Sequence, residues 1–301
     1  MHVHDCGPVA MSAPVLFCFG YGYSARALAA RLRPQGWQVR GTARSEEACA
    51  AIRAEGVTPY PFDRDRPLED AGAALSGVTH ILSSVPPDAA GDTVLDRHGD
   101  AIVALGGALA WCGYLSTTGV YGDHGGGWVD EATPLTPTTE RGRRRVDAEA
   151  GWCALWRDAR VPVHLFRLAG IYGPGRSALE TVRAGQARRI VKPGQVFSRV
   201  HVDDIAAVLE ASIVRPNPGA AYNVCDDDPA PPQDVIAHAC DLLGVAAPPE
   251  TPFDDAELSD MARSFYAENK RVSNGRIKDE LGVRLAYPDY RAGLAALLAA
   301  G

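Results

Sequence analysis

The feature that most constrains the fold is an apolar run that leads through a glycine-rich turn directly into a helical pattern. The run PVLFCF at 14–19 is followed by GYGYSA at 20–25, and apolar residues then recur at helical spacing as far as Leu32. Gly20, Gly22 and Ala25 form a G-x-G-x-x-A pattern. A strand before such a turn and an amphipathic helix after it favour a dinucleotide-binding unit over an ordinary turn, because the glycines let a pyrophosphate approach the backbone.

Strand-like and helix-like segments alternate through the first half of the chain. Helix 45–56 begins with Ser45 as an expected N-cap and ends at Gly56. Compact apolar runs between such helices are typical of a strand buried on both faces. Further strands are predicted at 37–42, 57–62, 78–85, 111–117 and 161–168. We therefore predict an α/β fold, a doubly wound parallel-sheet Rossmann fold with a smaller C-terminal substrate lobe.

The expected domain organisation follows the point at which this alternation loosens. The parts are a disordered extension at 1–13, a nucleotide-binding domain at 14–172 that is completed near 200–226, a smaller substrate lobe at 173–200 and 227–290, and a C-terminal helix end at 291–301.

The composition excludes several classes of function. The chain has 301 residues, 46% of them hydrophobic, and a net charge of −7, which argues against nucleic-acid and membrane-surface partners. No apolar run reaches membrane-spanning length. The seven cysteines form no C-x-x-C pair, so we expect a reduced, cytoplasmic protein, and no metal site is predicted.

The second strand ends without the acidic residue that holds the ribose in NAD-specific sites. The chain has Arg44 there, followed by Ser45. A guanidinium beside a helix start suits the 2′-phosphate of NADP, so NADP is favoured, with NAD and an ordinary solvated arginine as the alternatives. The cofactor-binding residues predicted from these strand ends are Gly20, Tyr21, Gly22, Tyr23, Ser24, Ala25, Arg44, Ser45, Asp63, Ser83, Ser84 and Val85.

Several segments in the same order along the chain resemble the extended short-chain dehydrogenase/reductase superfamily. They are LSTTGVYGD at 115–123, RLAGIYGPGR at 167–176, RVHVDDIAAVL at 199–209, AYNVCDDDP at 221–229 and NKRVSNGRIKDELG at 269–282. The resemblance implies an NAD(P)-dependent oxidoreductase, epimerase or dehydratase. Its substrate would be the carbinol or carbonyl of a small molecule, a nucleotide sugar among them. The resemblance also implies a homodimer through the helices that follow the fourth and fifth strands.

The resemblance also locates an altered catalytic motif in TPTTERGRRR at 136–145. It places Arg141 where the family has its catalytic tyrosine and Arg145 where it has its lysine, so this chain resembles the atypical branch. An arginine cannot readily release a proton. Thr117 matches the family's catalytic Ser/Thr, although a strand threonine is often structural. Tyr121 is our first candidate proton donor, with aromatic packing as the alternative. The two arginines between 141 and 145 are expected to face solvent.

On the substrate side, Tyr172, Arg176, Lys192 and Arg199 are predicted to line an anion pocket, with scattered surface arginines as the alternative. A second hypothesis for the whole chain is a non-catalytic NADP-binding or redox-sensing protein. A third is a structural protein that uses only the fold.

Overall fold

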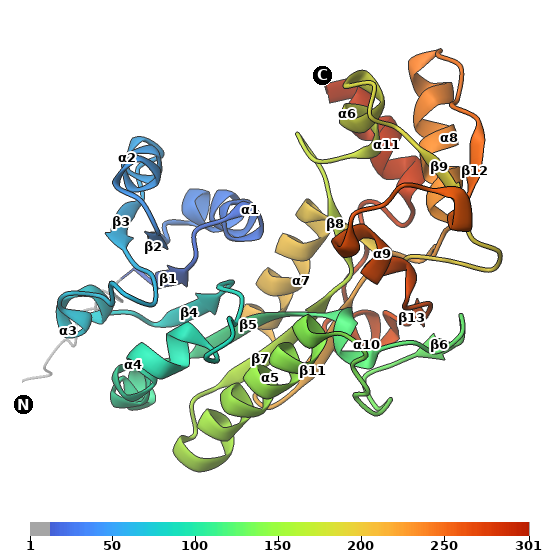
Figure 1. Cartoon of the computed structure of the whole chain (residues 1–301). Helices are drawn as coiled ribbons and strands as arrows, with labels where there is room; N and C mark the ends of the chain where they lie inside the picture. Colours follow the sequence, from blue (N-terminus) through green and yellow to red (C-terminus); the bar gives the residue numbers. More distant parts are fainter. Residues whose placement is uncertain (1–12, 301) are drawn as a thin grey trace, which may run out of the picture.

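We describe the protein from a computed structural model, which defines residues 13–300 (Figure 1). Residues 1–12 of the predicted extension lie outside this described part. A seven-stranded parallel sheet forms the centre of the molecule, and its helices cover both faces. From one edge to the other, its strands are β11 (Ala221–Val224), β7 (Val163–Leu168), β5 (Trp111–Thr117), β4 (His80–Ser83), β1 (Val15–Phe19), β2 (Gln38–Ala43) and β3 (Thr58–Pro61).

The strand order confirms the predicted doubly wound sheet. The chain moves outward from β1 through β2 to β3 and then returns to the other side of β1 with β4. Ligands of open parallel sheets bind outside the carboxyl ends of the strands, at the point where the order reverses. That point is the gap between the ends of β1 and β4, directly at the glycine turn.

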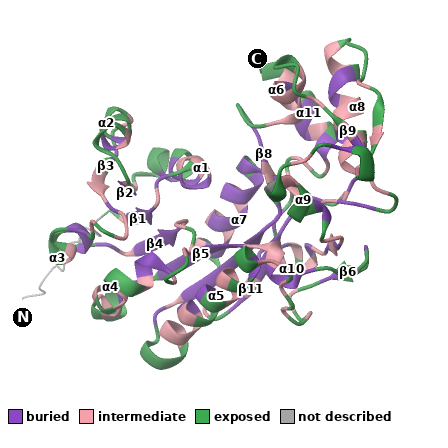
Figure 2. Cartoon of the chain, viewed as in Figure 1, coloured by how far each residue is buried: buried purple, intermediate pink, exposed green. Residues whose placement is uncertain are grey.

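β1 shows why the strands read as compact apolar runs. Leu16 and Cys18 belong to the core on one face of the sheet, and Phe17 and Phe19 belong to the core on the other face. Both sets of side chains are fully buried (Figure 2). Helices α1 (Tyr23–Leu32) and α7 (Val202–Val214) cover the first face. Helices α4 (Thr93–Ala104) and α5 (Glu140–Ala159) cover the second.

The sequence signals for the second helix are confirmed in detail. Helix α2 (Glu46–Ala54) begins after Ser45, whose side chain accepts a hydrogen bond from the amide of Ala48. It is followed by Gly56 with a φ of 74°, a left-handed conformation that glycine adopts without strain. Helix α3 (Ala71–Leu75) then connects β3 to β4.

Shorter elements form the remainder of the chain. Leu179, Val235, Ala239, Tyr290 and Leu294 make a separate apolar cluster between α6, α8 and α11. The additional helices are α6 (Ala178–Arg183), α8 (Pro232–Leu243), α9 (Asp260–Tyr266), α10 (Gly275–Asp279) and α11 (Tyr290–Ala300). The additional strands are β6 (Trp128–Val129), β8 (Gly170–Tyr172), β9 (Arg189–Val191), β10 (Arg199–His201), β12 (Glu250–Pro252) and β13 (Arg271–Val272). The 3-10 segments are Arg33–Gln35, Gly106–Ala108, Thr118–Tyr121 and Phe253–Asp255.

The outer edge of the sheet is built from the proline-containing strand β3. The amide of Phe62 donates to the carbonyl of Ala43 on β2. Because neighbouring backbone groups of a strand point alternately to its two sides, Pro59 and Pro61 occupy positions whose nitrogen atoms face away from β2. The free side of β3 therefore lacks two of the donors that another strand would need.

Candidate active site

The two glycines of the turn after β1 have different spatial surroundings. Gly20 has a φ of 81°, and a Cβ atom placed on it would lie 2.7 Å from Oγ of Ser84. A Cβ atom on Gly22 would meet nothing within 4 Å. The first glycine is thus required by the fold, whereas the second leaves open space at the carboxyl end of β1.

Side chains from the two neighbouring strands hold this turn. The amide of Gly20 donates to Oγ1 of Thr42 at 2.7 Å, and Oγ of Ser84 donates to the carbonyl of Gly20 at 2.5 Å. No side chain caps the N-terminus of α1 within the described structure. The first amides of that helix therefore remain available to an anion. Thr42 carries a role that the sequence reasoning did not give it.

Tyr21 and Tyr23, the aromatic residues of the turn, contact other parts of the chain. Tyr21 is buried against Gly41, where a Cβ atom would collide with the tyrosine side chain. Tyr23 reaches away from the turn, and its hydroxyl donates to the carbonyl of Pro174 at 3.0 Å. Ser24 and Ala25 are buried at the start of α1. Of the predicted loop residues, Tyr23 thus connects the turn to the loop at 173–176.

The residues after β2 and β3 present charge at the adjacent edge. Arg44 is exposed, and its side chain has no hydrogen bond or ion pair with any residue that the structure describes. Ser45 caps α2. Asp63 accepts hydrogen bonds from the amides of Asp65 at 3.0 Å and Arg66 at 2.9 Å. Asp63 therefore shapes its own turn through one carboxylate oxygen.

The three predicted residues at the end of β4 have distinct roles. Ser83 is fully buried, and its hydroxyl has no partner within the described residues. Ser84 braces Gly20 through its hydroxyl. Val85 is half-buried, and its side chain would lie 3.3 Å from a Cβ atom on Gly20. Ser84 and Val85 therefore line the turn itself, and Ser83 lies beneath it.

Thr117 lies half-buried at the carboxyl end of β5. Its hydroxyl oxygen accepts a hydrogen bond from the amide of Gly119 at 3.2 Å. The hydroxyl proton remains available for donation, so the geometry is compatible with the predicted role toward a substrate oxygen.

Tyr121, the first candidate proton donor, is buried and has its hydroxyl bonded within the protein. Its side chain is 0% exposed. The hydroxyl donates to Oδ1 of Asn223 at 2.7 Å and accepts from the guanidinium of Arg167 at 2.9 Å. Arg167 is itself paired with Glu149 of α5 at 2.8 Å. Burial raises the pKa of Tyr121 against the opposing effect of Arg167, so its proton is held in a closed network.

The arginines of α5 separate into two groups. Arg143 and Arg144 form exposed ion pairs with Glu140 at 3.2 and 3.1 Å, as expected of a solvated helix face. Arg145 donates to the carbonyl of Leu115 at 2.7 Å and to the hydroxyl of Tyr114 at 3.0 Å. In the lysine position, an arginine thus fastens α5 to β5.

Arg141, in the tyrosine position, contacts a different part of the molecule. It is exposed, and its guanidinium lies 4.9 Å from the ring centre of Phe265 on α9. The helix start reaches this position because residue 142 is a glycine. A Cβ atom on Gly142 would lie 2.9 Å from the carbonyl of Gly119. Arg141 and Arg145 therefore contact different elements, α9 and β5.

A cavity of about 570 Å³ lies beside the loop at 173–176. Tyr172, Arg176 and Arg199, three of the four residues expected on the substrate side, line it. The guanidinium of Arg176 also lies 6.0 Å from the ring centre of Tyr23. One arginine therefore contacts the tyrosine of the glycine turn and forms part of the cavity wall.

Lys192, the fourth residue expected on the substrate side, is not among the residues that line this cavity. Its amine donates to the carbonyl of Tyr266 and lies 5.5 Å from the ring centre of Phe253. The strand pairing of β9 with β12 directs this part of the chain toward α9 instead. Lys192 thus contacts a small apolar cluster near α9.

Two ionisable groups adjoin each other at the cavity wall: Arg199, which lines it and is half-buried, and Asp226, which is buried. Arg199 donates to the carbonyls of Phe197 at 2.8 Å and Ala230 at 3.0 Å. Burial lowers its pKa, against the opposing charge of Asp226. Asp226 is 2% exposed, and burial raises its pKa to about 8. Its Oδ2 atom has no hydrogen-bond partner in the described part of the chain. Asp226 was not predicted as a site residue because it lies in the acidic run at 226–228, a pattern typical of exposed residues.

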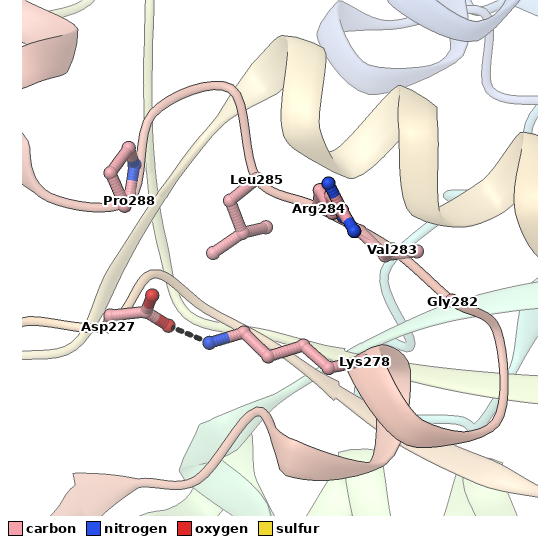
Figure 3. A pocket seen from close by; sticks show the side chains of 7 residues that line it. All are labelled: Asp227, Lys278, Gly282, Val283, Arg284, Leu285 and Pro288. Carbon is pink, nitrogen blue, oxygen red and sulfur yellow. Dashed lines mark hydrogen bonds and ion pairs between the residues drawn. The ribbon is translucent and has the colours of Figure 1, made fainter.

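A second hollow, of about 500 Å³, contains none of the predicted site residues. Figure 3 shows Lys278 donating to Asp227 across it, with Arg284 and Leu285 on the opposite wall. The Lys278–Asp227 distance is 2.5 Å. This hollow lies between α10 and the segment leading to α11, away from the glycine turn.

The described residues contain neither a group of metal ligands nor a membrane-spanning helix. Among residues 13–300, no group of three or more His, Cys, Asp and Glu side chains is placed to hold a metal ion. Over that part of the chain, no helix is both long and apolar enough to span a membrane.

Comparison with known proteins places this geometry in a family. No family model matches the chain. A solved structure described as a functionally unknown conserved protein from Silicibacter pomeroyi DSS is 57% identical, with a TM-score of 0.88 over 96% of this chain and 99% of that one. The chain belongs to that protein's family. Protein YeeZ of Escherichia coli K12 is 28% identical over 90% of this chain and 95% of its own length.

More distant structures identify the fold. The dTDP-glucose 4,6-dehydratase of Bacillus anthracis, solved with NAD, has a TM-score of 0.73 at 15% identity, over 95% of this chain and 96% of that one. This chain therefore shares the fold of that dehydratase.

Proposed function

We propose that this chain binds a nicotinamide dinucleotide at the turn after β1. The observation that carries the proposal is the contrast between the two glycines, one crowded by Ser84 and the other facing open space. The uncapped N-terminus of α1 adjoins that space. These features fit a pyrophosphate, which needs close backbone approach and free amide donors.

We further propose NADP as the preferred form. Arg44 is exposed and unpaired within the described structure, at the position where NAD-specific sites carry an acid. A guanidinium there supplies charge and paired donors for a 2′-phosphate. The dehydratase of Bacillus anthracis was solved with NAD, so the preference rests on this chain's own arginine.

The proposed activity is that of an oxidoreductase of the epimerase/dehydratase type, acting on a carbinol or carbonyl carbon. The dinucleotide supplies a hydride acceptor or donor when it is bound. Thr117 would donate a hydrogen bond to the substrate oxygen, and Arg141 would stay beside Phe265 of α9. Because arginine stays protonated, the chain would polarise the oxygen rather than transfer a proton from residue 141.

The cavity of about 570 Å³ beside Arg176 and Arg199 is the proposed substrate site. Its three lining arginines, Arg176, Arg188 and Arg199, outnumber its one carboxylate, Glu180, and favour a substrate that carries an anionic group, a nucleotide sugar among them. Arg176 would link the bound substrate to the glycine turn, because it also lies against Tyr23.

A second candidate, a protein that holds NADP without turnover, is supported by a specific observation. The buried hydroxyl of Tyr121 cannot replace the missing tyrosine, and Arg145 is bonded to the backbone of β5.

The two candidates differ in a direct experiment. NADPH oxidation would be measured with a panel of carbonyl compounds and nucleotide sugars, alongside calorimetry with NADP and NAD. Turnover with one substrate class, lost in Thr117→Val and kept in Thr117→Ser, would support the enzyme. Binding without turnover across the panel would favour the second candidate. No binding of either dinucleotide at millimolar concentration would overturn both.

A further inference from the structure

Arg66 follows β3 in the chain but contacts the end of β2. Its guanidinium donates to the backbone carbonyl of Arg44 and pairs with the carboxylate of Glu46 at 3.3 Å. The β2 and β3 strands lie side by side with α2 next to them, so these contacts bridge two loops at one edge of the sheet (Figure 1). Neither Arg66 nor Glu46 is among the site residues predicted from the sequence.

The contact with a backbone carbonyl fixes where this charge lies. The carbonyl of Arg44 belongs to a residue whose side chain is exposed and unpaired within the described structure. Arg66 therefore brings a second guanidinium to the residue proposed to meet the 2′-phosphate. A cation held by a fixed acceptor loses less freedom on binding an anion than a free side chain does.

The two acidic partners of Arg66 differ in how easily an incoming phosphate could replace them. Glu46 is an exposed partner, with its side chain 73% accessible. Asp63 lies farther away, with Oδ2 3.9 Å from Nε of Arg66, and its other oxygen is bonded to backbone amides. An incoming phosphate could thus replace Glu46 without disturbing the turn at Asp63.

We propose that Arg66 is the second arginine of a 2′-phosphate site and that the carboxylate of Glu46 occupies the phosphate position beside Arg66 until NADP binds. The inference rests on the proposed function and extends it to the residues that set cofactor preference. A phosphate monoester carries about two negative charges at neutral pH. It would form stronger hydrogen bonds with Arg44 and Arg66 together than a single exposed carboxylate does with Arg66 alone.

The inference predicts opposite effects for the two members of the ion pair. Arg66→Ala removes a phosphate donor, so the Kd for NADP should rise about tenfold, while the Kd for NAD stays within about twofold. Glu46→Gln removes a competing anion, so NADP should bind several-fold more tightly with no gain for NAD. The NADP preference of the unmodified chain should also weaken as salt rises.

The experiment is isothermal calorimetry with NADP and NAD on the full chain and four variants. Arg44→Ala serves as the reference for the proposed site. Arg53→Ala, which removes an exposed arginine from the last turn of α2, is the matched control and should change neither affinity. Thermal melts would verify that each variant is folded.

The results separate this inference from the function on which it rests. If Arg44→Ala weakens NADP selectively but Arg66→Ala leaves the NADP-to-NAD ratio unchanged, the role of Arg66 is overturned and NADP binding stands. The same holds if Glu46→Gln weakens NADP. If the unmodified chain binds neither dinucleotide, the proposed function itself fails, and this inference fails with it.

Discussion

Gly20 and Gly22 are separated by one residue, yet they differ in why a glycine is needed at each position. Gly20 combines a positive φ with a close neighbour at Ser84, so its constraint comes from the folded chain. Gly22 has a φ of −98°, and a Cβ atom added to it would have no neighbour within 4 Å. Its constraint comes from the proposed ligand rather than from the fold.

Substituting the two glycines should therefore have separable effects. Gly20→Ala should lower the free energy of unfolding by about 1–3 kcal/mol, because it strains the backbone and crowds Ser84. Gly22→Ala should leave stability within about 1 kcal/mol but weaken dinucleotide binding by about tenfold or more, because the added methyl group would occupy the space proposed for the pyrophosphate. Urea unfolding and calorimetry measure the two quantities. Undiminished binding by Gly22→Ala would contradict the assigned phosphate position.

At the scale of elements, α5 is joined to the sheet by a buried ion pair. Glu149 of α5 and Arg167 of β7 have side chains 4% and 7% exposed. Burial would lower the pKa of Arg167, but the hydrogen bond and charge of Glu149 outweigh it and raise the pKa. Oγ of Ser116 donates to the same carboxylate at 2.6 Å. Because Ser116 precedes Thr117, this contact joins α5 to β5 at the residue next to the proposed catalytic threonine.

Removing one partner of this pair should destabilise the fold strongly. Glu149→Ala leaves the Arg167 charge buried, so the free energy of unfolding should fall by about 3–5 kcal/mol. Glu140→Ala removes an acid from the same helix, but its pairs with Arg143 and Arg144 are exposed, so solvent screens them and the loss should be much smaller than that of Glu149→Ala. Urea denaturation of both variants tests the difference. Equal losses would show that burial of the Glu149 pair does not control its contribution.

At the scale of the whole molecule, buried titratable groups set how stability varies with pH. Burial lowers the pKa of His80 and of His164 to about 4 in each case. Each histidine therefore stays neutral in the folded state, while the unfolded chain takes up a proton. The free energy of unfolding consequently falls as pH falls from about 6.5 toward 4. Asp226, with its pKa raised to about 8, acts in the other direction. The folded state keeps its proton, so stability falls as pH rises between about 4 and 8.

These opposing trends predict a stability maximum near a pH of about 6.5. Among the histidines and carboxyl groups with large shifts, two histidines outweigh one carboxyl group below it, and above it Asp226 continues to lose its proton. Asp226→Asn should therefore flatten the decline above that maximum and raise the free energy of unfolding at a pH of about 8 by about 1–3 kcal/mol. Urea unfolding at pH values of about 5, 6.5 and 8 measures this. A decline that persists unchanged in Asp226→Asn would exclude this group as its source.

The sequence predicts most of the sheet, because each strand and the glycine turn are encoded locally. Arg141 and Arg145 could be placed by motif alignment on one helix, a turn apart. Their contacts with two different elements were not predicted, because Phe265 and Leu115 lie far from both arginines in the sequence. The burial of Tyr121 likewise depends on Asn223, which lies 102 residues further along the chain. Side-chain partners this distant follow from strand pairing and leave no local pattern.

Pro59 and Pro61 have a consequence for how copies of the molecule meet. Aggregation through open sheets proceeds by the addition of a strand to an unpaired row of donors. In β3 that row is interrupted at two of the outward positions, so continuous sheets across neighbouring molecules are disfavoured at this margin. At high concentration, β3 should therefore resist joining a fibril-like stack, even though its backbone is otherwise extended and accessible.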